Sequence, residues 1–270
     1  MQTIDNIDQL SLKDRLPLLY LEHGKLSFSE YGFTFFNNLG KVLIPVCSIT
    51  TLLIGPGVSV TSDFVANSAK NNVLLLWVGE GCTKIYSTGM ASVTACTERV
   101  LKQSFIITNW EERIAHLTRL YQCMFPGLQI PQYNTLDHYR GWEGSKVRGK
   151  YKEIAEQYGI DWKSRREAEH DLQVVLNVSN GCLYALVEAV TLSCGLHSAL
   201  GIIHQGDQRS LVYDIADTVK FNWFLPRVFG FYKEGASDPF RDSRKFCREL
   251  FINSNLTKKL FDNVKYIYQL

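Results

Sequence analysis

The spacing of apolar residues changes near residue 89, and this change limits the folds that the chain can adopt. The first 88 residues contain short apolar runs separated by turn residues such as His23-Gly24 and Gly55-Pro56-Gly57, a pattern that is typical of β-strands. After residue 89, apolar residues recur at helical spacing in longer segments that end at glycine or proline. We therefore expect an α+β protein with an N-terminal β-domain over residues 1–88 and an all-helical domain over residues 89–270.

Individual elements follow from the same patterns. Strands are predicted at residues 18–21, 25–28, 33–36, 42–46, 51–54, 73–78 and 84–86, interrupted by one short helix at 62–70. The run Leu74–Val78 does not alternate between apolar and polar residues, so we expect a strand that is covered on both faces. Helices are predicted at residues 96–107, 110–124, 136–158, 182–194, 210–221, 242–250 and 256–268. Residues 165–174 are polar and are expected to form a linker or mobile loop.

Composition excludes several classes of protein. The chain is 46% hydrophobic and 21% charged, which fits a folded soluble protein. It has an odd number of cysteines, seven, and no CxxC pair, so neither a disulfide framework nor a zinc site is indicated. The polar, acidic start does not resemble a signal peptide, and prolines and glycines interrupt the most apolar stretch, residues 42–60. We expect a cytoplasmic protein without a membrane span.

Basic residues gather in two stretches that the net charge of +2 conceals. Residues 144–166 contain seven lysines and arginines against three acidic residues, and residues 241–248 add four more. Local clusters of this kind favour nucleic-acid binding. The alternative is that each stretch forms an ordinary solvated helix face.

Glu143 is the unusual residue of the third predicted helix. It lies four residues before Val147, and this spacing places it on the apolar stripe of the helix. A carboxylate that is removed from water needs a partner, because an unpaired buried charge is costly. Glu143 could therefore bind a cation, cap the start of the helix, or pair with Arg140 or Arg148.

A second acidic pair lies near residue 214. Asp214 and Asp217 are three residues apart on a predicted helix, so they share a face. The helix dipole would favour one aspartate there, but two neighbouring carboxylates repel each other unless a cation or a proton joins them. His204 precedes them in a stretch that Gly201 and Gly206 make loop-like, and it is a plausible third ligand.

One imidazole and several carboxylates are the ligands that Mg²⁺ or Mn²⁺ accepts more readily than zinc does. Such an ion, with lysines and arginines nearby, points to phosphodiester chemistry. His170-Asp171 could instead mark a metal phosphohydrolase with His138 and Asp214, but this doublet lies in a polar, aperiodic stretch. No Walker loop or dinucleotide-binding glycine motif is present.

At these segments the sequence resembles the CRISPR-associated spacer integrases, the Cas-one family, and most of all their type I-E branch. The matching segments are Leu-Lys-Asp-Arg (12–15), Leu-Trp-Val-Gly-Glu (76–80), Tyr-Ser-Thr-Gly (86–89), Arg-Gly-Trp-Glu-Gly-Ser-Lys-Val-Arg (140–148), Tyr-Gly-Ile-Asp-Trp (158–162), Cys-Leu-Tyr (182–184), Glu-Ala (188–189) and Val-Tyr-Asp-Ile-Ala-Asp-Thr-Val-Lys-Phe (212–221). Because these motifs occur in order over nearly the whole chain, the resemblance is specific.

The resemblance implies roles for individual residues. The metal-binding residues of the family fall on Glu143, His204 and Asp217, and its additional catalytic aspartate falls on Asp214. Together with the basic stretches, it gives a set of expected DNA contacts: Lys84, Arg148, Arg165, Arg166, Tyr184, Lys220, Arg241, Arg244, Lys245 and Arg248.

The resemblance also implies an activity and partners. A member of this family would use Mg²⁺ or Mn²⁺ to join the 3′-hydroxyl ends of short prespacer DNA to the repeat of a CRISPR array by transesterification. Its partners would be double-stranded DNA with single-stranded 3′ ends, CRISPR repeat DNA, a second copy of itself, and a small ferredoxin-like partner dimer of the Cas-two family. Two alternatives remain: a non-catalytic DNA-binding scaffold subunit of the same complex, and a general metal-dependent nuclease.

Four positions depart from the family pattern. His23 stands where the type I-E branch commonly has a DNA-stacking tyrosine, and Ser59 and Lys84 replace arginines. Asp207 replaces a basic residue in the histidine loop. Lys84 keeps the positive charge but loses the bidentate geometry of an arginine.

Overall fold

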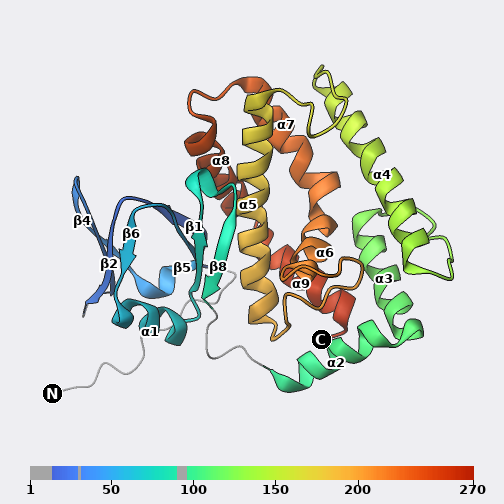
Figure 1. Ribbon diagram of the computed structural model, residues 1–270, viewed down its shortest axis with the longest axis horizontal. Coiled ribbons are helices and arrows are strands. Elements are labelled where there is room, and N and C mark those ends of the chain that lie inside the picture. Colours follow the sequence, from blue (N-terminus) through green and yellow to red (C-terminus); the bar gives the residue numbers. More distant parts are fainter. Residues whose placement is uncertain (1–13, 30–31, 90–95) are drawn as a thin grey trace.

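A computed structural model of the chain describes residues 14–29, 32–89 and 96–270. A strand-rich part lies on one side of the molecule and a helical part on the other, and the long helix α5 (His170–Ser193) lies next to the strands (Figure 1). The expected α+β class, strands with one short helix followed by helices alone, is confirmed.

The strand-rich part consists of two four-stranded sheets. The first has the order β1 (Leu16–Leu21), β5 (Ile49–Ile54), β7 (Leu74–Val78), β8 (Ile85–Gly89), and the second has the order β4 (Gly40–Ile44), β3 (Gly32–Asn37), β2 (Gly24–Ser29), β6 (Val58–Val60). In the first sheet β1, β5 and β7 are parallel and β8 is antiparallel to β7. In the second, β2, β3 and β4 are antiparallel, and β6 is parallel to β2.

A small core of its own holds the strand-rich part together. Leu26 and Phe33 of the second sheet and Leu52 and Leu75 of the first sheet are fully or almost fully buried in this core. Helix α1 (Ser62–Lys70) adds Phe64, whose ring centroid lies 4.6 Å from that of Phe33. The expectation that Leu74–Val78 is covered on both faces is confirmed, because β7 is an interior strand whose residues are almost all buried. The short strand β6 was not predicted.

Eight α-helices form most of the rest of the described chain. They are α2 (Thr97–Thr108), α3 (Trp110–Met124), α4 (Leu136–Gln157), α5, α6 (Ser210–Val219), α7 (Leu225–Glu234), α8 (Pro239–Asn253) and α9 (Leu256–Tyr268). Short 3₁₀ turns occupy Val46–Ser48 and Glu80–Cys82, and a π-helical turn, Lys220–Phe224, joins α6 to α7. The predicted helix at 210–221 therefore continues into a further helix, α7, that was not predicted.

Helix α5 forms the centre of the helical core. Nearly all of its side chains from Leu172 to Leu192 are buried, and it packs against α6, α8 and α9 as well as strands β1 and β5. By length and composition alone α5 could cross a membrane, but 89% of its most apolar window is buried inside the protein, as expected for a core helix. Among the described residues no other helix meets that length and composition.

The expectation of a loop over residues 165–174 is wrong for its second half. Helix α5 begins at His170, and Leu172 and Val174 are buried in the core. Because α5 is surrounded on all sides by other elements, its apolar residues do not form a stripe with helical spacing. The periodicity that revealed the other helices was therefore missing here.

Candidate metal centre

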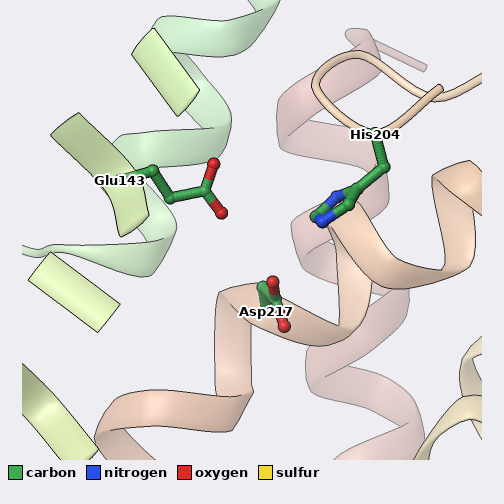
Figure 2. Close-up of side chains that lie close together, drawn as sticks. All are labelled: Glu143, His204 and Asp217. Carbon is green, nitrogen blue, oxygen red and sulfur yellow. The ribbon is translucent and has the colours of Figure 1, made fainter. Parts of the chain in front are cut away.

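Three side chains from three separate segments meet beside α6. Glu143 comes from the first half of α4, His204 from the loop before α6, and Asp217 from α6 itself (Figure 2). One potential ligand atom of each residue lies within 4.8 Å of the others. Glu143 and Asp217 are each only 7% exposed. The three residues line a pocket of about 450 Å³, which we call the metal-centre pocket.

Asp214 lies behind this group and holds His204 in place. Its carboxylate accepts hydrogen bonds from the backbone amides of Ile202, Ile203 and His204, the last two at 3.1 Å. It also lies 2.7 Å from Nδ1 of the His204 ring. A carboxylate on Nδ1 fixes the orientation of the ring and leaves Nε2 as the nitrogen available to a ligand.

Two arginines secure the same loop through its carbonyl groups. Arg113 of α3 donates from Nε to the carbonyl of Ile202 at 2.8 Å, and Arg140 of α4 donates from Nη2 to the carbonyl of Ile203 at 2.7 Å. Gly201 is required by close packing, because a Cβ atom there would collide with the carbonyl oxygen of His204. The loop that carries His204 is therefore fixed by α3, α4 and α6 together.

Glu143 has a buried tyrosine as its partner. The hydroxyl of Tyr121 lies 3.1 Å from Oε2 of Glu143 and 3.1 Å from the carbonyl oxygen of Tyr139, so it donates to this pair of acceptors. Burial, and then the nearby charge of Asp217, raise the pKa of Glu143 to about 7. The capping alternative for Glu143 is wrong, because Thr135 caps α4. Among the described residues Glu143 forms no ion pair with an arginine.

Asp217 forms a salt bridge with Lys220 at 3.1 Å. The Lys220 ammonium also donates to the hydroxyl of Tyr184 at 2.9 Å. Burial alone would lower the pKa of Lys220, but the Asp217 carboxylate and the phenols of Tyr184 and Tyr151 outweigh burial and raise it. Lys220 therefore carries a positive charge inside the metal-centre pocket.

The donor set fits a hard divalent cation. Two carboxylates and one imidazole suit Mg²⁺ or Mn²⁺ better than a thiolate-binding metal. Burial alone would lower the pKa of His204, but the hydrogen bond and charge of Asp214, with the charges of Asp217 and Glu143, raise it. The carboxylates around His204 therefore concentrate negative charge in the metal-centre pocket, and a bound cation would neutralise this charge.

The expected DNA contacts fall into two groups. Arg165 is exposed and lines the metal-centre pocket with Lys220, and its guanidinium donates to Asn177 at 2.7 Å. Tyr184 adjoins the pocket through Lys220. Arg148 and Arg166 are exposed, and neither lines this pocket.

The second group lies on α8 beside β1. Arg241, Arg244, Lys245 and Arg248 line a separate pocket of about 270 Å³ next to this strand. The Arg244 guanidinium stacks 3.9 Å from the centroid of the Tyr20 ring. Lys84 is exposed near the start of β8 and is absent from both pockets. The structure thus does not bring these five residues to the metal centre.

Sequence reasoning missed several residues of the centre. Tyr121, Arg113 and the loop-holding role of Arg140 were not predicted, because their partners are distant in sequence or are backbone groups. The only signal in the sequence was the presence of an arginine and a tyrosine in the predicted helix 110–124.

A buried group of carboxylates and an imidazole, set in a helical region beside basic side chains, is typical of metal-dependent enzymes that act on phosphodiesters. The family model described as "CRISPR associated protein Cas1" matches residues 99–264. The CRISPR-associated endonuclease Cas1 of Escherichia coli (strain K12) is 30% identical over 261 residues, which cover 94% of this chain and 85% of that protein. The chain therefore belongs to the Cas1 family.

Solved structures agree with this assignment. The crystal structure of a TtCas1–DNA complex is similar with a TM-score of 0.80 and 27% identity, covering 94% of this chain and 91% of that one. A CAS1 protein from Thermotoga maritima has a TM-score of 0.76 at 15% identity, covers 93% of this chain and 96% of that one, and supports the fold alone.

Proposed function

We propose that this chain is a metal-dependent DNA endonuclease and integrase of CRISPR adaptation, which joins the 3′-hydroxyl ends of short prespacer DNA to the repeat of a CRISPR array by transesterification. The observation that carries this proposal is the convergence of Glu143, His204 and Asp217 in a pocket that also contains Lys220 and Arg165. Further support comes from relatives over nearly the whole chain, such as the E. coli protein, that are named endonucleases.

Glu143, His204 and Asp217 would hold Mg²⁺ or Mn²⁺, which when bound supplies a Lewis acid for a phosphoryl oxygen and lowers the pKa of a hydroxyl group. Asp214 keeps Nδ1 of His204 engaged, so that the ring cannot turn away from the pocket. Tyr121 holds one oxygen of Glu143 by donating to it. These contacts position the ligands before any DNA arrives.

Lys220 is placed to bind a phosphate group. An ammonium has three donors, and among the described residues two are used, by Asp217 and Tyr184. The third donor can reach a phosphate oxygen in the pocket. Negative charge that develops on the phosphate during strand transfer would be stabilised by this fixed positive charge.

Arg165 at the metal-centre pocket and the basic group on α8 are proposed to bind the DNA backbone. Arginine is well suited to this task, because its planar fork matches phosphate oxygens, and binding of this kind weakens as salt is raised. The similar TtCas1 structure is itself a DNA complex. Lys84, Arg148, Arg166 and Tyr184 are proposed as further contacts.

We also propose that residues 1–88 act as a separate domain for dimerisation and for contacts with the partner and DNA, and residues 89–270 as the helical catalytic domain. A second copy of the chain and a small ferredoxin-like dimer of the Cas-two family would complete the assembly. The proposed setting is the cytoplasm, where the CRISPR array lies.

A half-site integration assay with prespacer DNA, repeat DNA, the small partner and Mn²⁺ tests the proposal. Glu143→Ala and Asp217→Ala should each abolish strand joining while DNA binding, measured by fluorescence anisotropy, is retained. Glu156→Ala is the matched control, because this exposed glutamate of α4 only pairs with Lys152 at 3.7 Å. Unchanged joining by the first two variants would overturn the assignment of the centre.

The same assay separates the alternatives. Equal cleavage of DNA that lacks the repeat would identify a general nuclease. No strand joining by the wild-type protein, together with tight DNA binding, would identify a scaffold subunit.

A further inference from the structure

A second pocket lies where the strand-rich part meets the helical part. It has a volume of about 440 Å³ and is lined by β8, the second half of α5, residues 197–199 and residues 208–209. It shares no residue with the metal-centre pocket. We call it the junction pocket.

The junction pocket contains a buried carboxylate that is only half satisfied. Glu188 of α5 is 4% exposed, and its Oε1 accepts a hydrogen bond from the Thr88 hydroxyl at 3.0 Å. Its Oε2 is buried and has no hydrogen-bond partner in the described part of the chain. Ser198, which lines the same pocket, also has a buried hydroxyl without a partner. Burying such groups without partners is costly, so native proteins rarely leave them unsatisfied.

Burial raises the pKa of Glu188, and the Thr88 hydrogen bond and the charge of Arg209 oppose this effect only in part. Arg209 lines the junction pocket, but the hydrogen bond of its guanidinium goes to the carbonyl of Ile85 at 3.4 Å. No ion pair of Glu188 is found among residues 14–29, 32–89 and 96–270. Residues 90–95, which follow β8 directly, contain no lysine or arginine. A cation that entered the junction pocket would therefore find Oε2 of Glu188 without a hydrogen-bond partner among the described residues, and it would favour the charged form of the carboxyl group.

We propose that the junction pocket binds an aliphatic ammonium group, carried by a lysine side chain of a partner or by a free amine. The ammonium would donate to Oε2 of Glu188 and to the hydroxyl of Ser198. An ammonium fits better than a guanidinium, because a guanidinium fork needs both carboxylate oxygens and Thr88 already occupies one. Ile85, Leu192 and Ala199 supply apolar walls for the aliphatic stem.

The location gives an occupant access to both parts of the molecule. Thr88 belongs to the strand-rich part, whereas Glu188 and Ser198 belong to the helical part. The carbonyl of Ser198 accepts a hydrogen bond from the Leu211 amide of α6 at 2.8 Å. An ammonium in the junction pocket would therefore link β8 to the segment that leads into the His204 loop.

Isothermal titration calorimetry of the full chain with butylammonium chloride, at constant ionic strength, tests this proposal. We expect saturable one-to-one binding that Glu188→Gln weakens at least tenfold, because glutamine keeps an acceptor for Thr88 but removes the charge. Ser198→Ala should weaken binding to a smaller extent. Asp161→Asn, which removes an exposed acid from a different pocket, should leave it unchanged, and 1-butanol should not bind.

A blocked tripeptide with a central lysine, compared with its norleucine analogue, separates the two sources of the ammonium. If the lysine peptide binds more tightly than butylammonium, the natural occupant is a lysine side chain of a partner. If butylammonium binds more tightly, the natural occupant is a free amine. Either result supports the site, provided that circular dichroism shows Glu188→Gln to be folded. The proposal would be overturned by equal binding to wild type and Glu188→Gln, or by the absence of saturable binding to wild type. It would also be overturned by a crystal structure, grown with the amine, in which Arg209 or water is bonded to Oε2 of Glu188.

Discussion

Asp214 and Asp217 lie on the same helix, yet their surroundings give them different tasks. Asp214 accepts three backbone amides and contacts the ring of His204, and its side chain is completely buried. Asp217 faces the pocket with Glu143 and pairs with Lys220. We therefore propose that Asp214 positions His204 and that Asp217 is a metal ligand.

Asp214→Asn should weaken the metal centre through the His204 loop. Asparagine presents an NH₂ group where the loop also presents donors, so at least one buried amide loses its partner, which costs about 1–3 kcal/mol of unfolding free energy. Loss of the carboxylate on Nδ1 should also lower Mn²⁺ affinity by about 10–100-fold. Urea denaturation and Mn²⁺ calorimetry measure the two effects. Asp262→Asn, on the exposed side of α9, is the control, and unchanged Mn²⁺ affinity in Asp214→Asn would contradict the positioning role.

Tyr121→Phe should change how the metal centre responds to pH. The hydroxyl of Tyr121 donates to Glu143 and lowers its pKa, partly opposing the effect of burial. Without this hydroxyl, the pKa of Glu143 should rise above its wild-type value of about 7. Mn²⁺ binding should then begin to weaken at a higher pH than in the wild type. The unfolding free energy should fall by only about 1 kcal/mol. Mn²⁺ titrations between pH 6 and pH 8.5 (roughly the range around this pKa) measure the shift, and Tyr266→Phe on the surface serves as control. A pH profile identical to wild type would exclude a role for this hydroxyl.

Helical spacing predicted the buried position of Glu143 and the shared face of Asp214 and Asp217. It could not assign their partners, because these are backbone amides of residues 202–204 and the hydroxyl of Tyr121, which lie on other segments. The residues that carry charge were therefore found from the sequence, whereas the residues that orient them required the fold.

At the scale of elements, local signals predicted boundaries well where they were strong. Helices α1, α3 and α9 begin and end at the predicted residues, and Thr61 and Asn109 cap the first two through their side chains. Besides the short strand β6, the elements that were missed are the first half of α5 and all of α7. Both follow from tertiary packing: α5 is buried on every side, and α7 continues from a π-helical turn.

Gly181 shows how packing overrides helix propensity in α5. A Cβ atom at this position would overlap the carbonyl oxygen of Cys82, so the glycine allows the Glu80–Cys82 turn to rest directly on the helix. Gly181→Ala should lower the unfolding free energy by about 1–3 kcal/mol, although alanine is the better helix former. Gly149→Ala in α4, where no atom lies within 4 Å, should raise it by about 0.5–1 kcal/mol. Urea denaturation compares the two, and a stabilised Gly181→Ala would refute the close contact.

At the scale of the whole molecule, the metal centre brings together segments that are far apart in the sequence. Glu143 and Asp217 are anchored in different helices, and Arg113 of α3 secures the loop between them. Excess negative charge in such a centre opposes folding, because the carboxylates repel one another in the folded state only. The stability of the whole chain should therefore report on the state of the centre.

The contribution of the metal centre to the stability of the metal-free chain should fall as pH rises. The folded-state pKa of Glu143 is raised from 4.5 to about 7, and that of His204 is raised from 6.5, so between pH 4.5 and pH 7 these two groups bind more protons in the folded chain than in the unfolded chain. By linkage, the Glu143 shift alone removes about 3 kcal/mol across this window. Thermal melts should show that Glu143→Gln loses most of this slope.

Mn²⁺ should restore that stability at pH 8 (about one unit above the Glu143 pKa), because it binds the folded chain alone. At 100 times its dissociation constant, a ligand of this kind stabilises by about 2.7 kcal/mol. We expect Mn²⁺ to raise the melting temperature of wild type but not of Glu143→Gln or Asp217→Asn, with Glu156→Gln responding like wild type. An equal rise in all four proteins would show that Mn²⁺ binds elsewhere, and a pH slope unchanged in Glu143→Gln would show that another group controls it.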